Sequence, residues 1–490
     1  MIETVEIKSS ETLDDYAAVV HYAPSVYSLR TEANALLRRL SHRKIWMVNS
    51  TPRGGGVAEM LPKVVSILQE LGVPTEWVAA GTSRPEFFEL TKRIHNLIHG
   101  KQGLELTNGD RELYEAVSRE NADELKGRIQ PDDILVIHDP QPLGMGAMLS
   151  RELGIPTIFR CHIGLDQDVK ETRSAWDFLS PFANSCNYSI FSASEYIPGF
   201  LAGRSGVIHP AIDPMSPKNK ELGASHVAGI LSSARLDDYR HPVVMPPFPT
   251  PAQRLCPDGE FRDVSHSGGI GLLFRPVVTQ VSRWDHLKGF QPLIQGFLRM
   301  KEILVSGKHE LNEHHRRRLE LVRLVLVGPD PAAIQDDPEA QEVLQELIST
   351  YRCLPPQQQE DVALISLPMN SVESNALMVN ALQRCSTVVV QNSIREGFGL
   401  TVTEAMWKRS AVLGTRACGI RKQIRDGIDG RLTQNPEDPD EIAYLMNSML
   451  EDYDDRGRYG LNAQRRVHDE FLIFTQVRRW LQVLAEHAGP

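Results

Sequence analysis

The feature that most constrains the fold is an alternation, present in both halves of the chain, between short apolar runs and longer amphipathic segments. Runs that are apolar at nearly every position are typical of strands covered on both faces. Strands that alternate with helices predict parallel sheets with crossover helices, and therefore an α/β fold. The predicted strands cover residues 44–49, 75–79, 133–138, 156–161 and 188–192 in the first half, and 276–281, 321–327, 387–391 and 410–414 in the second.

The clearest helix is predicted from Val57 to Leu71, where apolar residues recur with the 3.6-residue period. A chain of 490 residues is too long for one core, so we expect two large domains. The first is predicted over residues 1–213 and the second over 276–469. Residues 214–275 are proline-rich and lack periodicity, so they are predicted to be a hinge and an irregular insertion.

Composition excludes several classes of protein. Hydrophobic residues at 41% and charged residues at 24% are ordinary for a globular protein, and a net charge of -10 argues against a general nucleic-acid binder. The six cysteines show no CxxC spacing, so neither a zinc site nor a disulfide framework is indicated. Because no signal peptide or membrane span is visible, we expect a cytoplasmic protein without nucleic-acid or membrane partners.

Two carboxylates flank a glycine turn directly after the predicted strand at 387–391. Glu396 precedes Gly-Phe-Gly, and Glu404 follows eight residues later. Ligands of open α/β sheets collect beyond the carboxyl ends of such strands, so both are candidate binding residues. The pattern Thr401-Val402-Thr403-Glu404 also fits a helix capping box, which leaves a purely structural role open for Glu404. Glu396 has no such structural explanation.

Two cations, Arg283 and Lys288, follow the predicted strand at 276–281. Paired Arg and Lys side chains in a cleft can stabilise the negative charge that develops on a departing diphosphate. The alternative is an exposed basic loop.

Three further segments are candidates in the first half. Gly54, Gly55 and Gly56 lie between the first strand and the first helix, where they form either a ligand cradle or a plain connection. The segments 137–142 and 159–163 end two strands with polar side chains, among them Asp139 and His162. Such residues can bind sugar hydroxyls or stabilise a cationic transition state, although a histidine after a strand is often structural.

Several motifs together resemble a known family. EGFGLTVTEAMWK at 396–408 and SRWDHLKG at 282–289 look like the retaining glycosyltransferases of the GT-B fold, whose E-x7-E motif matches Glu396 and Glu404. NSTPRGGGVAEML, VIHDPQP, FRCHIGL and IDPMSPKN add a specific resemblance to the trehalose glycosyltransferring synthases, which join nucleotide-activated glucose to free glucose. The resemblance covers nearly the whole chain.

The resemblance implies a GT-B fold, in which two Rossmann-like domains face each other across a deep cleft. It also implies a C-terminal helix, at about 470–490, that crosses back to the first domain. The implied reaction is the reversible, retaining transfer of glucose from a nucleoside diphosphate glucose to glucose, which forms trehalose. No tightly bound cofactor or metal site is implied; Mg2+ remains compatible with the sequence, although no visible motif requires it.

Residue roles follow from the same resemblance. Arg283 and Lys288 match the pair that grips the diphosphate of the sugar donor, while Glu404 matches the ligand of the ribose hydroxyls. Glu396 is expected to bind a hydroxyl of the transferred glucose. The other implied site residues are His162 near the donor sugar, Asp139 near the acceptor, Gly55 and Gly56 in a closing loop, and the amides of Gly397, Phe398, Gly399 and Leu400.

Three alternatives stay open on the sequence. A retaining trehalose phosphorylase would share related motifs but use phosphate in place of the nucleotide. The glucosyl group could also go to another small acceptor, such as glycerate or a fructose derivative, and a silent nucleotide-sugar sensor would bind the donor without turnover. The sequence indicates neither the preferred base nor the oligomeric state, and a homodimer is compatible with it.

Overall fold

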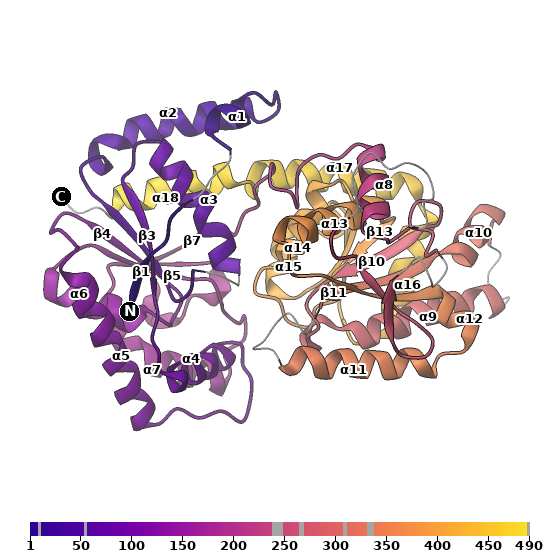
Figure 1. Cartoon of the computed structure of the whole chain (residues 1–490), viewed down its shortest axis with the longest axis horizontal. Coiled ribbons are helices and arrows are strands. Elements are labelled where there is room, and N and C mark those ends of the chain that lie inside the picture. Colours follow the sequence, from indigo (N-terminus) through magenta and orange to yellow (C-terminus); the bar gives the residue numbers. More distant parts are fainter. Residues whose placement is uncertain are drawn as a thin grey trace. The chain divides into compact units, whose positions relative to one another are not determined.

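The computed structural model describes residues 1–7, 11–52, 56–237, 248–263, 269–306, 311–330 and 338–487. The chain divides into two compact units, one formed by Met1–Asp213 with Phe471–Pro490 and the other by Pro214–Glu470. Each unit is a sheet with helices on its faces, which confirms the predicted α/β class (Figure 1). No helix among the described residues is both long and apolar enough to cross a membrane.

The sheet of the first unit has the strand order β1-β3-β2-β4-β5-β6-β7. All neighbouring strands are parallel except β1 and β3, which are antiparallel. The five predicted strands are present, and β1 and β7 were not predicted because both are short and incompletely buried. The strands are β1 (Ile2–Thr4), β2 (Ile45–Asn49), β3 (Thr75–Ala80), β4 (Ile134–His138), β5 (Thr157–Cys161), β6 (Tyr188–Phe191) and β7 (Ser205–Val207).

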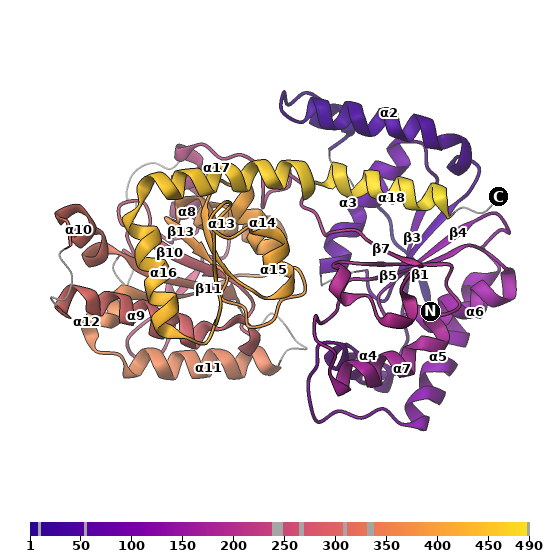
Figure 2. The same ribbon diagram turned by 180° about the vertical axis from the view of Figure 1, so that it is seen from behind.

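The helices of the first unit include the predicted one, observed as α3 (Gly56–Glu70). The C-terminal helix α18 (Ile473–Glu486) belongs to this unit and packs against α2 and α3 (Figure 2). The preceding helix in the chain, α17 (Tyr453–Glu470), belongs to the second unit. The remaining helices are α1 (Leu13–Ala17), α2 (Ala23–Leu40), α4 (Pro85–Ile98), α5 (Asn108–Lys126), α6 (Leu143–Leu153), α7 (Lys170–Ala183), η1 (Ser194–Tyr196) and η2 (Gly199–Leu201).

The sheet of the second unit has the order β15-β14-β13-β10-β11-β12-β8-β9. The strands from β15 to β12 are parallel, whereas β8 and β9 are antiparallel. The predicted strands correspond to β10 (Val277–Val281), β11 (Arg323–Pro329), β13 (Val388–Val390) and β14 (Ala411–Thr415); β8 (Gln253–Leu255), β9 (Phe261–Asp263), β12 (Val362–Leu367) and β15 (Arg431–Thr433) were not predicted.

The expectation that residues 214–275 form an irregular insertion is wrong for much of this stretch. It contains α8 (Ala224–Ser233), and β8 pairs with the edge of β12 and with β9. Buried Leu236, Ala252 and Ile270 belong to a hydrophobic cluster that includes Val325 of β11. The segment folds because it supplies hydrogen-bond partners to a sheet edge and covers apolar side chains. Residues 238–247 and 264–268 lie outside the described residues.

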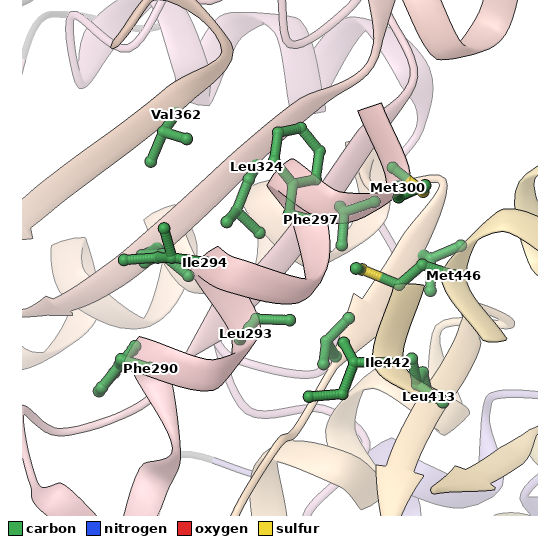
Figure 3. Packing of buried hydrophobic residues seen from close by; sticks show 14 of the residues in the cluster. Phe290, Leu293, Ile294, Phe297, Met300, Leu324, Val362, Leu413, Ile442 and Met446 are labelled. Carbon is green, nitrogen blue, oxygen red and sulfur yellow. The ribbon is translucent and has the colours of Figure 1, made fainter. Parts of the chain in front are cut away.

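The main core of the second unit lies between its sheet and the helices α9 (Phe290–Ser306) and α16 (Pro439–Glu451). Figure 3 shows Met300 of α9 close to Met446 of α16, with Phe297 of α9 between Met300 and Leu324 of β11 in this view. The other helices are η4 (His286–Lys288), α10 (Glu313–Leu321), α11 (Pro338–Cys353), α12 (Pro356–Asp361), α13 (Val372–Cys385), α14 (Leu400–Trp407) and α15 (Cys418–Gln423).

A close backbone approach holds the turn between β13 and α14. A Cβ added to Gly419, in α15, would lie 2.3 Å from Cα and 2.6 Å from the nitrogen of Phe398. The backbone nitrogen of Gly419 also donates a hydrogen bond to the carbonyl oxygen of Glu396 at 3.2 Å. Only glycine leaves room for this contact, so α15 determines where the turn after Glu396 runs.

We therefore predict that Gly419→Ala shifts the turn and lowers the free energy of unfolding of the second unit by about 1–3 kcal/mol. Gly457→Ala is the matched control because Gly457 lies inside α17 and its added Cβ meets nothing within 4 Å. That control should gain about 0.5–1 kcal/mol, since alanine favours a helix interior. Urea unfolding followed by circular dichroism measures both changes, and equal stability of the two variants would contradict the close contact.

Candidate functional site

An ion pair joins the two loops that follow β10 and β13 in the second unit. Lys288 Nζ lies 2.6 Å from Glu396 Oε2, and the two side chains are only 13% and 14% exposed. The hydroxyl of Ser393 donates a second hydrogen bond to the same oxygen at 3.1 Å. β10 and β13 are adjacent parallel strands, so their carboxyl ends meet at one edge of the sheet. Two candidate residues from different segments of the sequence thus lie together at that edge of the sheet.

Gly397, Phe398 and Gly399 form the turn from Glu396 into α14. Gly399 precedes the helix with a φ of 84°, a left-handed conformation that favours glycine. A Cβ added to Gly397 would meet nothing within 4 Å, so this part of the turn faces open space in the described structure. Leu400 begins α14, and no side chain caps the start of this helix.

Glu404 is not a capping residue. The residue before α14 is Gly399, and Thr401 lies inside the helix, where its hydroxyl bonds Gln391 Oε1 at 3.0 Å. The capping-box interpretation is therefore wrong. Glu404 is 5% exposed, and its buried Oε2 has no hydrogen-bond partner among the described residues. A buried carboxylate oxygen without a partner is unusual and can accept a hydrogen bond from a ligand hydroxyl.

Two lysines near Glu404 were not identified from the sequence. Lys218 Nζ lies 3.8 Å from Glu404 Oε1. Lys408, one helical turn after Glu404, donates to the carbonyl oxygen of Glu404 at 3.0 Å and to Asn219 Oδ1 at 3.3 Å. Burial lowers the pKa of Lys408, although the charge of Glu404 opposes this shift. The sequence signal was Lys408 itself, a lysine four residues after Glu404 that directly follows α14.

Arg283 occupies a different environment from Lys288. Its side chain is 62% exposed, and its Nη2 lies 3.6 Å from Asp285 Oδ2. The two cations therefore share a loop, and Lys288 is the one whose close contact with Glu396 is described above.

Of the three glycines at 54–56, the structure describes Gly56. Gly56 begins α3, and a Cβ added there would meet nothing within 4 Å. Gly55 lies outside the described residues.

The ends of β4 and β5 bring four polar residues together in the first unit. His138 ends β4 and pairs in register with Arg160 of β5. Asp139 follows with a φ of 66°, a conformation that is uncommon for a residue with a side chain. Its Oδ1 accepts a hydrogen bond from the backbone nitrogen of His162 at 2.7 Å, and its own nitrogen donates to the carbonyl oxygen of Arg160 at 2.8 Å.

The electrostatics of this group depend on burial. Burial raises the pKa of Asp139 to about 6, although the His162 amide and the Arg160 charge act against it. Burial, reinforced by Arg160, lowers the pKa of His138 to about 3 and that of His162 well below its usual value. Both imidazoles are therefore neutral near pH 7, and each presents one N–H and one lone pair.

Arg160 and His138 are part of this site but were not predicted as site residues. Arg160 is 1% exposed and donates through Nη2 to the carbonyl oxygen of Ile208 at 2.8 Å and to Ser192 Oγ at 3.3 Å. Its desolvation lowers the pKa of the guanidinium to about 10. The available signal was an arginine inside an otherwise apolar predicted strand.

One group of side chains in the described part of the chain has spacing suited to a metal ion. His286, Glu342 and Glu346 are all exposed, and their ligand atoms lie within 4.8 Å of one another. Exposed acidic residues are often grouped in this way, so the group does not by itself indicate a metal site.

Two family descriptions match the chain. "Trehalose synthase, N-terminal domain" matches residues 47–198, and "Glycosyl transferases group 1" matches residues 370–466. The first contains Asp139 and His162, and the second contains Glu396 and Glu404.

Solved structures with the same fold include a trehalose-phosphate synthase from Burkholderia xenovorans in complex with glucose-6-phosphate. It has a TM-score of 0.61 at 14% identity and covers 90% of this chain and 100% of its own. A protein from Anabaena, HepE, in complex with UDP and glucose, has a TM-score of 0.56 at 16% identity and covers 91% and 100%. At this level of identity the likeness shows the fold alone, which is GT-B.

Curated relatives match the chain from end to end. Trehalose synthase of Pyrococcus horikoshii is 32% identical and covers 100% of both chains. Trehalose synthase of Rubrobacter xylanophilus is 31% identical over 98% of each chain. A trehalose phosphorylase of Grifola frondosa is 26% identical and covers 89% of this chain but 56% of its own. The similarity over the full length, together with the two matching domains, shows that the chain belongs to the trehalose synthase family of glycosyltransferases.

Proposed function

We propose that the protein is a retaining glucosyltransferase that moves glucose from a nucleoside diphosphate glucose to free glucose and forms trehalose reversibly. The observation that carries this proposal is the largely buried ion pair between Lys288 and Glu396, beside the open turn at Gly397. It supplies a cation for a phosphate and a carboxylate for a sugar hydroxyl at one sheet edge. The relatives named trehalose synthase support the choice of product.

The donor would be held by the second unit. In our proposal, Lys288 and Arg283 bind its diphosphate, and the buried Glu404 accepts hydrogen bonds from the ribose hydroxyls through the oxygen that lacks a partner. Glu396 accepts a hydrogen bond from the glucosyl group. The amides from Gly397 to Leu400 contribute further donors at the start of α14.

In the proposed reaction the acceptor hydroxyl attacks the anomeric carbon from the face that the nucleotide leaves. The bond between that carbon and the phosphate oxygen breaks, and its electron pair goes to the leaving diphosphate. A phosphate oxygen takes the proton of the acceptor hydroxyl as the new glycosidic bond forms. Lys288 and Arg283 stabilise the charge that develops on the leaving group. Asp139 and His162 of the first unit are proposed to contact the sugars.

The reaction can be tested with the purified protein and a panel of nucleoside diphosphate glucoses, each with free glucose. We expect trehalose and nucleoside diphosphate in equal amounts, and the reverse reaction from trehalose with a nucleoside diphosphate. Chromatography of the sugars and nucleotides measures both. Release of glucose 1-phosphate from trehalose with inorganic phosphate, and no reaction with any nucleoside diphosphate, would instead identify a phosphorylase.

Replacement of the cations should impair turnover. Lys288→Ala and Arg283→Ala are each expected to lower kcat by about 100-fold or more, because each removes a charge that stabilises the leaving group. Arg317→Ala is the matched control, since Arg317 is an exposed arginine of α10 with 67% of its side chain accessible. Initial rates at saturating substrate measure the effect. Near-normal kcat in Arg283→Ala would show that this residue does not contact the diphosphate.

Glu404→Gln should weaken donor binding specifically. Loss of a charged hydrogen bond to the ribose is expected to raise the KM for the nucleotide sugar by about 10-fold or more, while the KM for the glucose acceptor stays unchanged. Glu320→Gln on α10 is the control, because Glu320 is exposed and forms a surface ion pair with Arg317. Steady-state kinetics with each substrate varied measures the difference, and an unchanged donor KM would remove Glu404 from the ribose site.

A further inference from the structure

Three side chains from neighbouring segments of the first unit form a line of polar contacts. His138 of β4 lies between Met47 of β2 and His162, which follows β5. His138 Nε2 is 3.4 Å from Met47 Sδ, and His138 Nδ1 is 3.0 Å from His162 Nε2. The two imidazole rings are nearly parallel, with an interplanar angle of 17°. His138 therefore uses both of its ring nitrogens within this line.

The positions of the protons follow from the chemistry of the two ends. A thioether sulfur can only accept a hydrogen bond, so the nitrogen that faces Met47 is favoured when it carries a proton. A lone pair on that nitrogen would face the lone pairs of sulfur. With the proton on His138 Nε2, the neutral ring has its lone pair on Nδ1, which accepts from His162 Nε2–H. His162 then keeps its lone pair on Nδ1.

We propose that Met47 and His138 are positioning residues that hold His162 in the tautomer with a protonated Nε2 and a free lone pair on Nδ1. His162 is thereby a hydrogen-bond acceptor toward its ligand and not a donor. Asp139 complements this arrangement, since its carboxylate holds the backbone nitrogen of His162 at 2.7 Å. The backbone and the ring of His162 are thus held by two different neighbours.

The remaining nitrogen of His162 indicates what the site would bind. His162 Nδ1 is buried and has no hydrogen-bond partner among the described residues, while the residue as a whole is partly exposed. A buried acceptor without a partner costs free energy that a ligand hydroxyl can recover. The identity of the ligand rests on the proposed function. The ligand is a sugar, and one of its hydroxyl groups donates a hydrogen bond to His162 Nδ1.

The tautomer can be measured without any activity. In protein labelled with 15N-histidine, long-range 1H–15N correlation spectra distinguish a protonated from an unprotonated ring nitrogen, and His138→Gln and His162→Gln assign the signals. We expect protonated Nε2 and unprotonated Nδ1 in both rings. A protonated Nδ1 on His162, or a doubly protonated ring, would overturn the proposal. Because the spectra need no substrate, this result is independent of whether the protein forms trehalose.

Kinetics with sugar analogues tests whether a sugar hydroxyl donates a hydrogen bond to His162. The hydroxyl that contacts His162 is the position at which a deoxy sugar loses kcat/KM in the wild type but not in His162→Ala. At this position a fluoro sugar should lose as much as the deoxy sugar, because fluorine cannot donate a hydrogen bond to the lone pair of His162. A fluoro sugar that retains the activity of the hydroxyl compound would show that His162 donates, and would overturn the assignment.

Met47→Leu separates positioning from packing. The substitution nearly conserves volume and removes the sulfur acceptor, so the tautomer should become mixed in the spectra. We expect kcat/KM for the natural sugar to fall roughly fivefold, the amount of one neutral hydrogen bond, with no change for the deoxy sugar. Met300→Leu, at a buried methionine in the core of the second unit, is the matched control and should change neither. An unchanged tautomer in Met47→Leu would show that the sulfur does not set it.

Discussion

The contact between Lys288 and Glu396 is the interaction on which the arrangement of the second unit's site depends. β10 and β13 lie side by side and run parallel, so the loops that follow them leave the sheet at the same edge. The 2.6 Å ion pair ties these loops together where little of either side chain is exposed. Removal of one partner would leave the other charge half-buried and unpaired, so each residue orients the other before a ligand arrives.

Around this pair, glycine determines the path of the backbone. Gly399 adopts a left-handed conformation that turns the chain into α14, and Gly419 allows α15 to approach the backbone of Phe398. The turn is therefore held by main-chain contacts together with the side chain of Gln423, whose Nε2 donates to the carbonyl oxygens of Phe398 and Gly399. Glu404 then lies inside α14, buried and one helical turn before Lys408. A turn held in this way beside a buried carboxylate suits recognition of a polar ligand.

In the first unit, several ionisable groups are buried together at the ends of β4 and β5. Arg160 is held inside the sheet by carbonyl and hydroxyl oxygens, and its charge helps to keep His138 and His162 neutral. Asp139 has a strained φ of 66° and a raised pKa, both of which cost stability. Such costs are typical of sites where a side chain must be held in one orientation. The ring of Trp480, from α18, lies 6.0 Å from that of His138, so the C-terminal helix also borders this group.

Local pattern was enough to predict nine strands with apolar runs, α3, and the position of Glu396, Lys288, Asp139 and His162 after strand ends, because burial on both faces leaves a direct mark on sequence. It missed β12, although this strand is buried at every position. Edge strands such as β9 and β15 carry no such mark, and the position of β8 and β9 follows from their pairing beside β12. Only the tertiary structure decided that Glu404 is buried without capping a helix, that Lys288 forms an ion pair with Glu396, and that His138 lies between Met47 and His162. The physical reason is that these properties arise from atoms far apart in the chain, whose distances and protonation depend on how the strands pack.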